Sequence, residues 1–187
     1  MKWLAERYLT IRGWEFTGQV PDFPKLIALG VPHTSNWDFV VFLAILHHFK
    51  IKMSFIGKHT LFRRPFGFLF RRWGGISVDR SKPRGLVSQV VEAINDAPTM
   101  MLAVAPEATR QPAPYWKAGF IRIAQEAGVP VVLSYVDYST KTTGFGPTIE
   151  DVSDPAAVMD EARSFYADKE GRYPDQKGPV RLRNESR

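Results

Sequence analysis

The sequence predicts a single α/β domain, in which a central, mostly parallel or mixed β-sheet is flanked by helices. Short β-branched or apolar runs alternate with longer segments of helical periodicity, which is the pattern of strands joined by helices. No repeat, low-complexity block or linker divides the 187 residues, so residues 1–187 are expected to form one domain. With 44% hydrophobic and 24% charged residues, the composition is that of an ordinary globular protein.

Five strands and five helices are expected along the chain. The strands are placed at Leu26–Leu29, Met53–Ile56, Ile76–Val78, Met100–Ala105 and Val131–Val136. The helices are placed at Asp38–Phe49, Arg64–Trp73, Arg84–Asn95 and Lys117–Ala127, with a last one that starts at Pro155. Ser35 or Asn36 is expected to cap the first helix and Asp154 the last, and Gly128 to end the fourth in the left-handed conformation.

The two ends of the chain differ in character. Residues 1–20 interleave aromatic and basic side chains, which suits the interface of a bilayer; a helix packed against the domain would show the same pattern. Residues 170–187 form a polar tail with no assigned structure. The longest apolar run, Phe39–Leu46, has eight residues, against about 20 for a spanning helix, and no signal peptide is recognised. We therefore expect a cytoplasmic protein that lies peripherally on the inner face of the membrane.

Cysteine is absent and basic residues are concentrated in one region. Without cysteine there is no disulfide, thiolate nucleophile or Cys-ligated zinc site, and no motif for a catalytic metal is found. The formal net charge is +6, and residues 58–84 hold eight Lys or Arg residues against one Asp. Such a region favours an anionic partner: phospholipid head groups, a phosphorylated substrate, an acidic carrier protein or nucleic acid. A solvated basic face is the alternative.

His33 and Asp38 are the candidate catalytic pair. His33 follows a predicted strand, and Asp38 lies in the first turn of the next helix. If the intervening residues form a tight turn, the carboxylate accepts a hydrogen bond from the imidazole and fixes its tautomer. The other ring nitrogen is then free to take a proton from a hydroxyl. The spacing alone is weak evidence, because most His–Asp pairs in sequences are accidental.

Three further segments follow in order, and with them the chain resembles the 1-acyl-glycerol-3-phosphate (lysophosphatidic acid) acyltransferase family. His33 and Asp38 match the family's His-x4-Asp block. Gly75-Ile76-Ser77-Val78-Asp79-Arg80 is similar to its second block. Pro106-Glu107-Ala108-Thr109-Arg110 stands where the family has Pro-Glu-Gly-Thr-Arg, and Val129-Pro130-Val131-Val132 looks like its Val-Pro strand. The resemblance covers residues 28–138 and implies a glycerolphosphate-acyltransferase-like fold.

The resemblance also implies a reaction and a set of site residues. A fatty acyl group would move from acyl-CoA or acyl-carrier protein to the hydroxyl of a lysophospholipid or glycerol-phosphate-like acceptor. His33 would act as general base, with no bound cofactor, no metal and no nucleic-acid partner. The substrate-binding candidates are Lys58, Arg80, Glu107, Thr109 and Arg110, with Arg80 on the acceptor's phosphate. The candidates for an acyl tunnel are Leu61, Phe62 and Phe66.

Two departures from the family pattern leave the acceptor open. Ala108 replaces the third block's glycine, so we expect either a right-handed turn or a different local shape. Thr60 replaces the usual glutamate. Two other functions fit the same residues: a non-catalytic basic module that binds membranes or nucleic acid, and an acyl-thioester hydrolase that uses the same base with water as acceptor.

Overall fold

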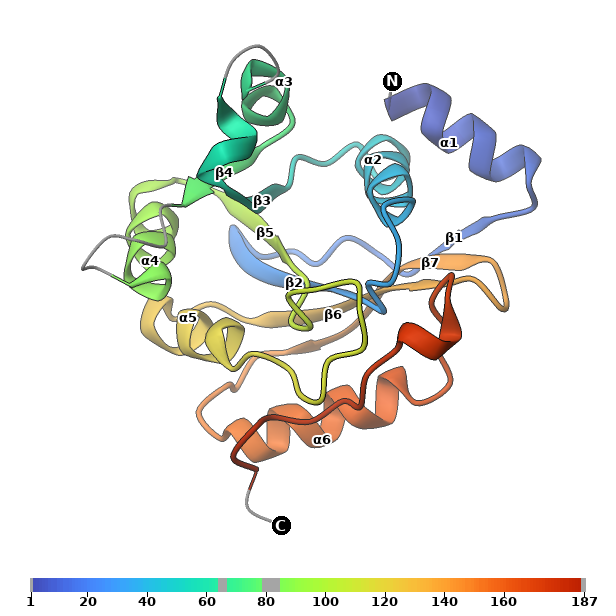
Figure 1. The fold of residues 1–187 in the computed structure, drawn as a ribbon. Helices are drawn as coiled ribbons and strands as arrows, with labels where there is room; N and C mark the ends of the chain where they lie inside the picture. The colour runs from blue at the N-terminus through green and yellow to red at the C-terminus, as the bar shows by residue number, and fades with distance from the viewer. Residues whose placement is uncertain (1, 64–66, 79–84, 186–187) are drawn as a thin grey trace.

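A seven-stranded sheet forms the centre of the computed structural model, which describes residues 2–63, 67–78 and 85–185, without the side chains of residues 58, 59 and 61. The strand order is β1-β7-β6-β2-β5-β3-β4 (Figure 1). The strands are β1 (Glu15–Thr17), β2 (Lys25–Val31), β3 (Ser54–Lys58), β4 (Gly75–Val78), β5 (Met100–Val104), β6 (Val131–Asp137) and β7 (Thr142–Ile149).

Every neighbouring pair of strands is parallel except β6 and β7. β2 lies between β5 and β6, with Ile27 opposite Leu102 on one side and Val131 on the other. Its apolar run is typical of a strand covered on both faces. The carboxyl ends of β2, β5 and β3 therefore lie at one edge of the sheet, where the loops that follow them meet.

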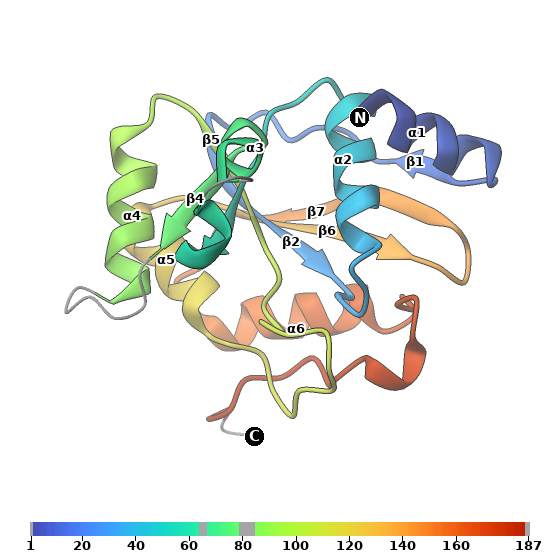
Figure 2. The same ribbon diagram turned by 45° about the horizontal axis from the view of Figure 1, so that its top comes forward.

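Helices cover both faces of the sheet (Figure 2). They are α1 (Lys2–Ile11), α2 (Asp38–His48), α3 (Gly67–Arg72), α4 (Leu86–Asp96), α5 (Gly119–Ala127) and α6 (Pro155–Tyr166), with short 3-10 helices at His59–Phe62 and Pro174–Gln176. α1 and α2 pack on one face with the side chains of Leu26 and Ala28. α4, α5 and α6 pack on the other with those of Ile27 and Leu29. Among the described residues, no helix has both the length and the apolar character needed to cross a bilayer.

The predicted elements are confirmed, with small shifts at their ends. All five predicted strands are present, and α2, α4, α5 and α6 match the predicted helices. Asp154 accepts a hydrogen bond from Ala156 N as the cap of α6, and Gly128 is left-handed with φ 63°. α3 begins at Gly67; the predicted start at Arg64, like that of α4 at Arg84, lies outside the described residues.

Two expectations need correction. The residue that precedes α2 is Trp37, which makes no side-chain cap bond. Ser35 Oγ does accept a backbone N–H, that of Trp37 at 3.1 Å, but this bond lies in the turn before the helix. The prediction also lacked β1 and β7. β1 has only three residues, and the alternation of β7 is interrupted by Gly144, Gly146 and Pro147.

Candidate active site

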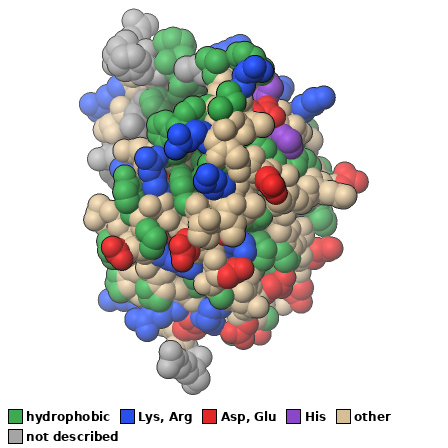
Figure 3. Space-filling model, turned by 90° about the vertical axis from the view of Figure 1, so that its right-hand side faces the viewer, with side chains coloured by type: hydrophobic (Ala, Val, Ile, Leu, Met, Phe, Trp, Pro, Cys, Tyr) green, Lys and Arg blue, Asp and Glu red, His purple; other side chains and the backbone are tan. Residues whose placement is uncertain are grey.

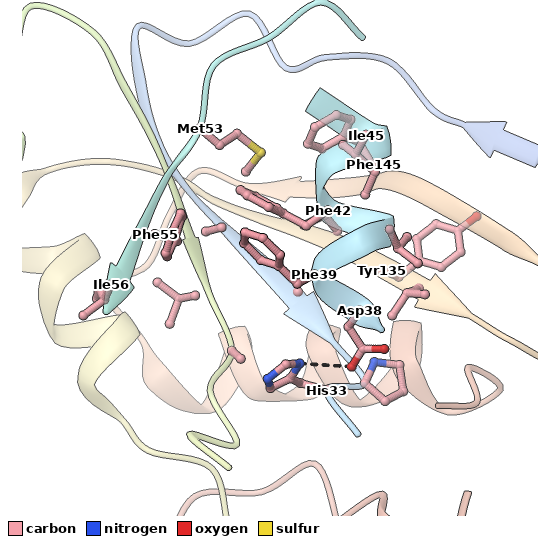
Figure 4. Close-up of a pocket in the computed structure, with 18 residues that line it drawn as sticks. His33, Asp38, Phe39, Phe42, Ile45, Met53, Phe55, Ile56, Tyr135 and Phe145 are labelled. Carbon is pink, nitrogen blue, oxygen red and sulfur yellow. Dashed lines mark hydrogen bonds and ion pairs between the residues drawn. The ribbon is translucent and has the colours of Figure 1, made fainter. Parts of the chain in front are cut away.

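His33 and Asp38 meet at the carboxyl end of β2, as predicted. His33 Nδ1 lies 3.0 Å from Asp38 Oδ2 (Figure 4). Since Nδ1 faces the carboxylate, this nitrogen carries the proton of the neutral ring and Nε2 is left as the basic atom. The His33 side chain is 29% exposed and that of Asp38 8%, so the imidazole is accessible while the carboxylate is protected from water.

Asp38 accepts four hydrogen bonds, which hold its carboxylate in a fixed orientation. Besides the ring of His33, Oδ2 accepts Thr34 N at 3.0 Å and Ser35 N at 2.9 Å. Oδ1 accepts the hydroxyl of Tyr138 at 2.8 Å. Burial, followed by the negative charge of Asp38, raises the pKa of Tyr138, so the phenol stays a donor. Tyr138 follows β6 and was not predicted.

Glu107 lies behind His33 and is 6% exposed. Its Oε1 accepts the backbone N–H of His33 at 3.1 Å, and its Oε2 has no partner among the described residues. Burial raises the pKa of Glu107 to about 7, although the bond from His33 opposes the shift. The structure thus brings Glu107 of the third block against the turn of residues 33–38, which we call the catalytic turn because it holds the candidate catalytic pair.

The third block forms a tight turn in which Ala108 N donates to Ala105 O at 3.0 Å. Ala108 has φ 58°, so the expectation of a right-handed turn or a different shape is wrong: the alanine adopts the left-handed conformation that glycine favours. Thr109 Oγ1 accepts Gln111 N at 3.1 Å. Arg110 extends from this turn with an exposed side chain.

An apolar cavity of about 260 Å³ runs from His33 beneath α2. Figure 4 shows Phe39, Phe42 and Ile45 of α2 lining it together with Met53, Phe55 and Phe145. His33 and Asp38 lie at one end, and the other described residues that line it are uncharged. These α2 side chains were not predicted to line a tunnel, because their pattern is equally that of a core helix.

A second cavity of about 680 Å³ lies on the other side of His33. It is bounded by the third-block turn and by the amino end of α5, and it carries the cations Arg110 and Lys117 with the hydroxyl of Thr109. Ala103 and Val104 of β5 line both cavities, as does Ala105, which directly follows this strand. His33 therefore lies between an apolar cavity and a cationic one.

Some of the predicted site residues do not line these cavities, and others lie outside the described residues. Phe62 is buried, with its ring 6.1 Å from that of Phe70, and does not line the apolar cavity. Glu107 lines neither cavity. Arg80 and Phe66, and the side chains of Lys58 and Leu61, lie outside the described residues. Within the described segments, no three His, Cys, Asp or Glu residues are grouped so that they could hold a metal ion.

Comparison with known proteins agrees with this arrangement. Residues 21–135 match the family model described as Acyltransferase. Since the match covers more than half of the chain, the protein belongs to the Acyltransferase family and is an acyltransferase. The predicted resemblance is thereby confirmed.

A solved structure has the same fold. The crystal structure of the 1-acyl-sn-glycerophosphate (LPA) acyltransferase PlsC from Thermotoga maritima superposes with a TM-score of 0.64. The match covers 88% of this chain and 74% of that one, at 17% sequence identity. No curated protein sequence matches significantly.

Proposed function

We propose that the enzyme transfers a fatty acyl group from an acyl thioester to the hydroxyl of a phosphate-bearing glycerolipid, with His33 as general base. The observation that carries this proposal is the position of His33 between the two cavities. The apolar cavity suits an alkyl chain, since each buried methylene contributes roughly 0.8 kcal/mol. The cationic cavity suits a phosphate, which arginine binds through paired hydrogen bonds. PlsC, which has the same fold, is a 1-acyl-sn-glycerophosphate acyltransferase.

The chemistry needs no nucleophilic side chain. His33 Nε2 removes the proton of the acceptor hydroxyl as its oxygen attacks the thioester carbonyl. Asp38 stabilises the imidazolium that forms. When the intermediate collapses, the C–S bond breaks and the thiolate takes the proton from His33. The products are an ester and a free thiol. Glu107 and Tyr138 act as positioning residues, one through the backbone of His33 and the other through Asp38.

The proposal also names the acyl donor and the helix that contacts the membrane. The donor is acyl-CoA or acyl-carrier protein, used as a substrate without a bound cofactor. α1 is proposed to lie on an anionic membrane surface. Its buried residues Ala5 and Leu9 face the domain, while Leu4 and Ile11 are 59% and 75% exposed.

Replacement of the base and of its partner tests the mechanism. His33→Ala and Asp38→Ala should each lower thiol release from palmitoyl-CoA, with lysophosphatidate as acceptor, by about 10²-fold or more. His48→Gln is the control, because His48 bonds Glu6 on α1 and lies outside both cavities. Full turnover in either Ala variant would contradict the mechanism. Release of free fatty acid without any need for the acceptor would identify a hydrolase instead.

A further inference from the structure

A third cleft lies beside the catalytic turn and is lined by two arginines from distant parts of the chain. It has a volume of about 370 Å³, and Arg110 and Arg172 line it together with the uncharged residues Asn36, Gln111 and Gln176. No aspartate or glutamate is among the lining residues in the part of the chain that the structure describes. Cations and neutral donors without a carboxylate are a suitable setting for an anion.

The segment that carries Arg172, residues 171–176, is fixed on the catalytic turn at both ends. Tyr173 N donates to Thr34 Oγ1 at 3.2 Å. A Cβ atom at Gly171 would lie 2.5 Å from the same oxygen, so only glycine permits this approach. With its amide oriented to satisfy the hydrogen-bond donors, the Gln176 nitrogen donates to Thr34 O at 3.0 Å and Arg110 O at 2.6 Å. Residues 171–176 thus join the first and third blocks, and we call them the C-terminal strap.

Arg172 is held in place but not neutralised. Its Cζ lies 5.2 Å from the centre of the Trp37 ring, a cation–π contact that leaves the N–H groups at the edge of the guanidinium available. No ion pair joins Arg172 or Arg110 to another described residue. The charge of Arg172 also lowers the pKa of Tyr138 against the larger effect of burial. Arg172 is therefore close to the phenol that bonds Asp38.

We propose that Arg110 and Arg172 form a phosphate subsite beside the catalytic turn, which holds a phosphate group of one of the two substrates. The inference rests on the proposed function, in which acyl-CoA and the glycerolipid acceptor both carry phosphates. Two guanidinium groups on one cleft can each offer a pair of N–H donors to such a group. Arg172 lies beyond residues 21–135, so this half of the subsite comes from outside the region that the family model matches.

Binding of inorganic phosphate tests the subsite without turnover. A phosphate titration followed by NMR should shift the indole N–H signal of Trp37, and Arg172→Gln should weaken the apparent affinity about tenfold or more. Arg183→Gln is the matched control, because Arg183 is also exposed and stacks on an aromatic ring, at 5.6 Å from that of Tyr115. Equal phosphate affinity in the two variants would overturn the proposal.

Steady-state kinetics then identify the substrate whose phosphate is bound. The donor arm compares palmitoyl-CoA with palmitoyl-pantetheine, which has no phosphate. The acceptor arm compares lysophosphatidate with monoacylglycerol. In one arm Arg172→Gln should raise KM about tenfold for the phosphate-bearing substrate only, with kcat nearly unchanged. An unchanged KM in both arms would overturn the proposal. If the wild type binds phosphate but turns over no thioester, the proposed function fails while the subsite stands.

Discussion

The carboxyl group of Glu107 is buried close to His33. Its pKa rises from the ordinary 4.5 to about 7 because it is buried. Between these values the native state binds about one proton more than the unfolded chain. The contribution of this group to stability is thus fully present below about pH 4.5 and is lost as the pH rises to about 7.

The pH dependence of unfolding tests this environment. Glu107→Gln cannot titrate, so its free energy of unfolding relative to the wild type should increase from pH 5 to pH 7.5. Urea unfolding at four pH values in this range measures the difference. Glu126→Gln, at an exposed carboxyl of α5, should leave the pH dependence of the free energy of unfolding unchanged. Parallel curves for the wild type and Glu107→Gln would show that Glu107 is ionised throughout.

The contacts of Asp38 show how far the sequence predicts the site. Three of its hydrogen-bond donors lie in residues 33–35, and a tight turn was enough to predict that His33 and Asp38 meet. The fourth, Tyr138, lies a hundred positions away, and its approach depends on the pairing of β6 with β2. No local pattern marks such a residue. The same holds for Arg172 and Gln176, in a tail that the sequence left unassigned.

At the scale of elements, the strands were predicted well because burial on both faces leaves few alternatives for an apolar run. β2 shows this: Ile27 and Leu29 enter one core, and Leu26 and Ala28 the other. β7 was not predicted because its glycines and proline resemble a turn. The turn of the third block lies where it was predicted. Its conformation was not predicted, because an alanine argues against a positive φ.

The conformation of Ala108 leads to a prediction of its own. An L-residue in the left-handed region costs roughly 1–2 kcal/mol, while glycine loses roughly 0.5–1 kcal/mol of chain entropy. Ala108→Gly should therefore stabilise the protein by about 0.5–1 kcal/mol. Ala157→Gly is a matched control, because Ala157 is also exposed but lies within α6, and it should destabilise. Thermal unfolding of both variants measures the contrast; a loss of stability in Ala108→Gly would contradict the strained turn.

In the whole molecule, the surface near α1 carries both basic and apolar side chains. On the face in Figure 3, Lys and Arg side chains lie among hydrophobic ones in the upper half and also in the lower half, where most of the carboxylates lie. Of the described residues that line a depression at the amino ends of the strands, five are cations and none is a carboxylate; the cations are Lys2, Lys50, Lys52, Arg71 and Arg72. Lys2 is the first residue of α1, so this basic depression adjoins the helix with the exposed apolar residues.

This arrangement predicts how the protein binds a membrane. Apolar residues that enter the interface and cations near anionic head groups contribute together, at about 1 kcal/mol for each cation close to the surface. Leu4→Ser with Ile11→Ser should therefore lower co-sedimentation with phosphatidylglycerol vesicles severalfold. Added salt should weaken the remaining binding, because it screens the cations.

Two controls separate this membrane contact from the chemistry. Vesicles of phosphatidylcholine should bind the wild type weakly, because they lack the net negative charge that the basic depression complements. Turnover of short-chain substrates dispersed as monomers should be equal in the wild type and the double variant, since α1 lines neither cavity at His33. If the double variant binds anionic vesicles as well as the wild type does, α1 is not the membrane contact, and its apolar face needs another explanation.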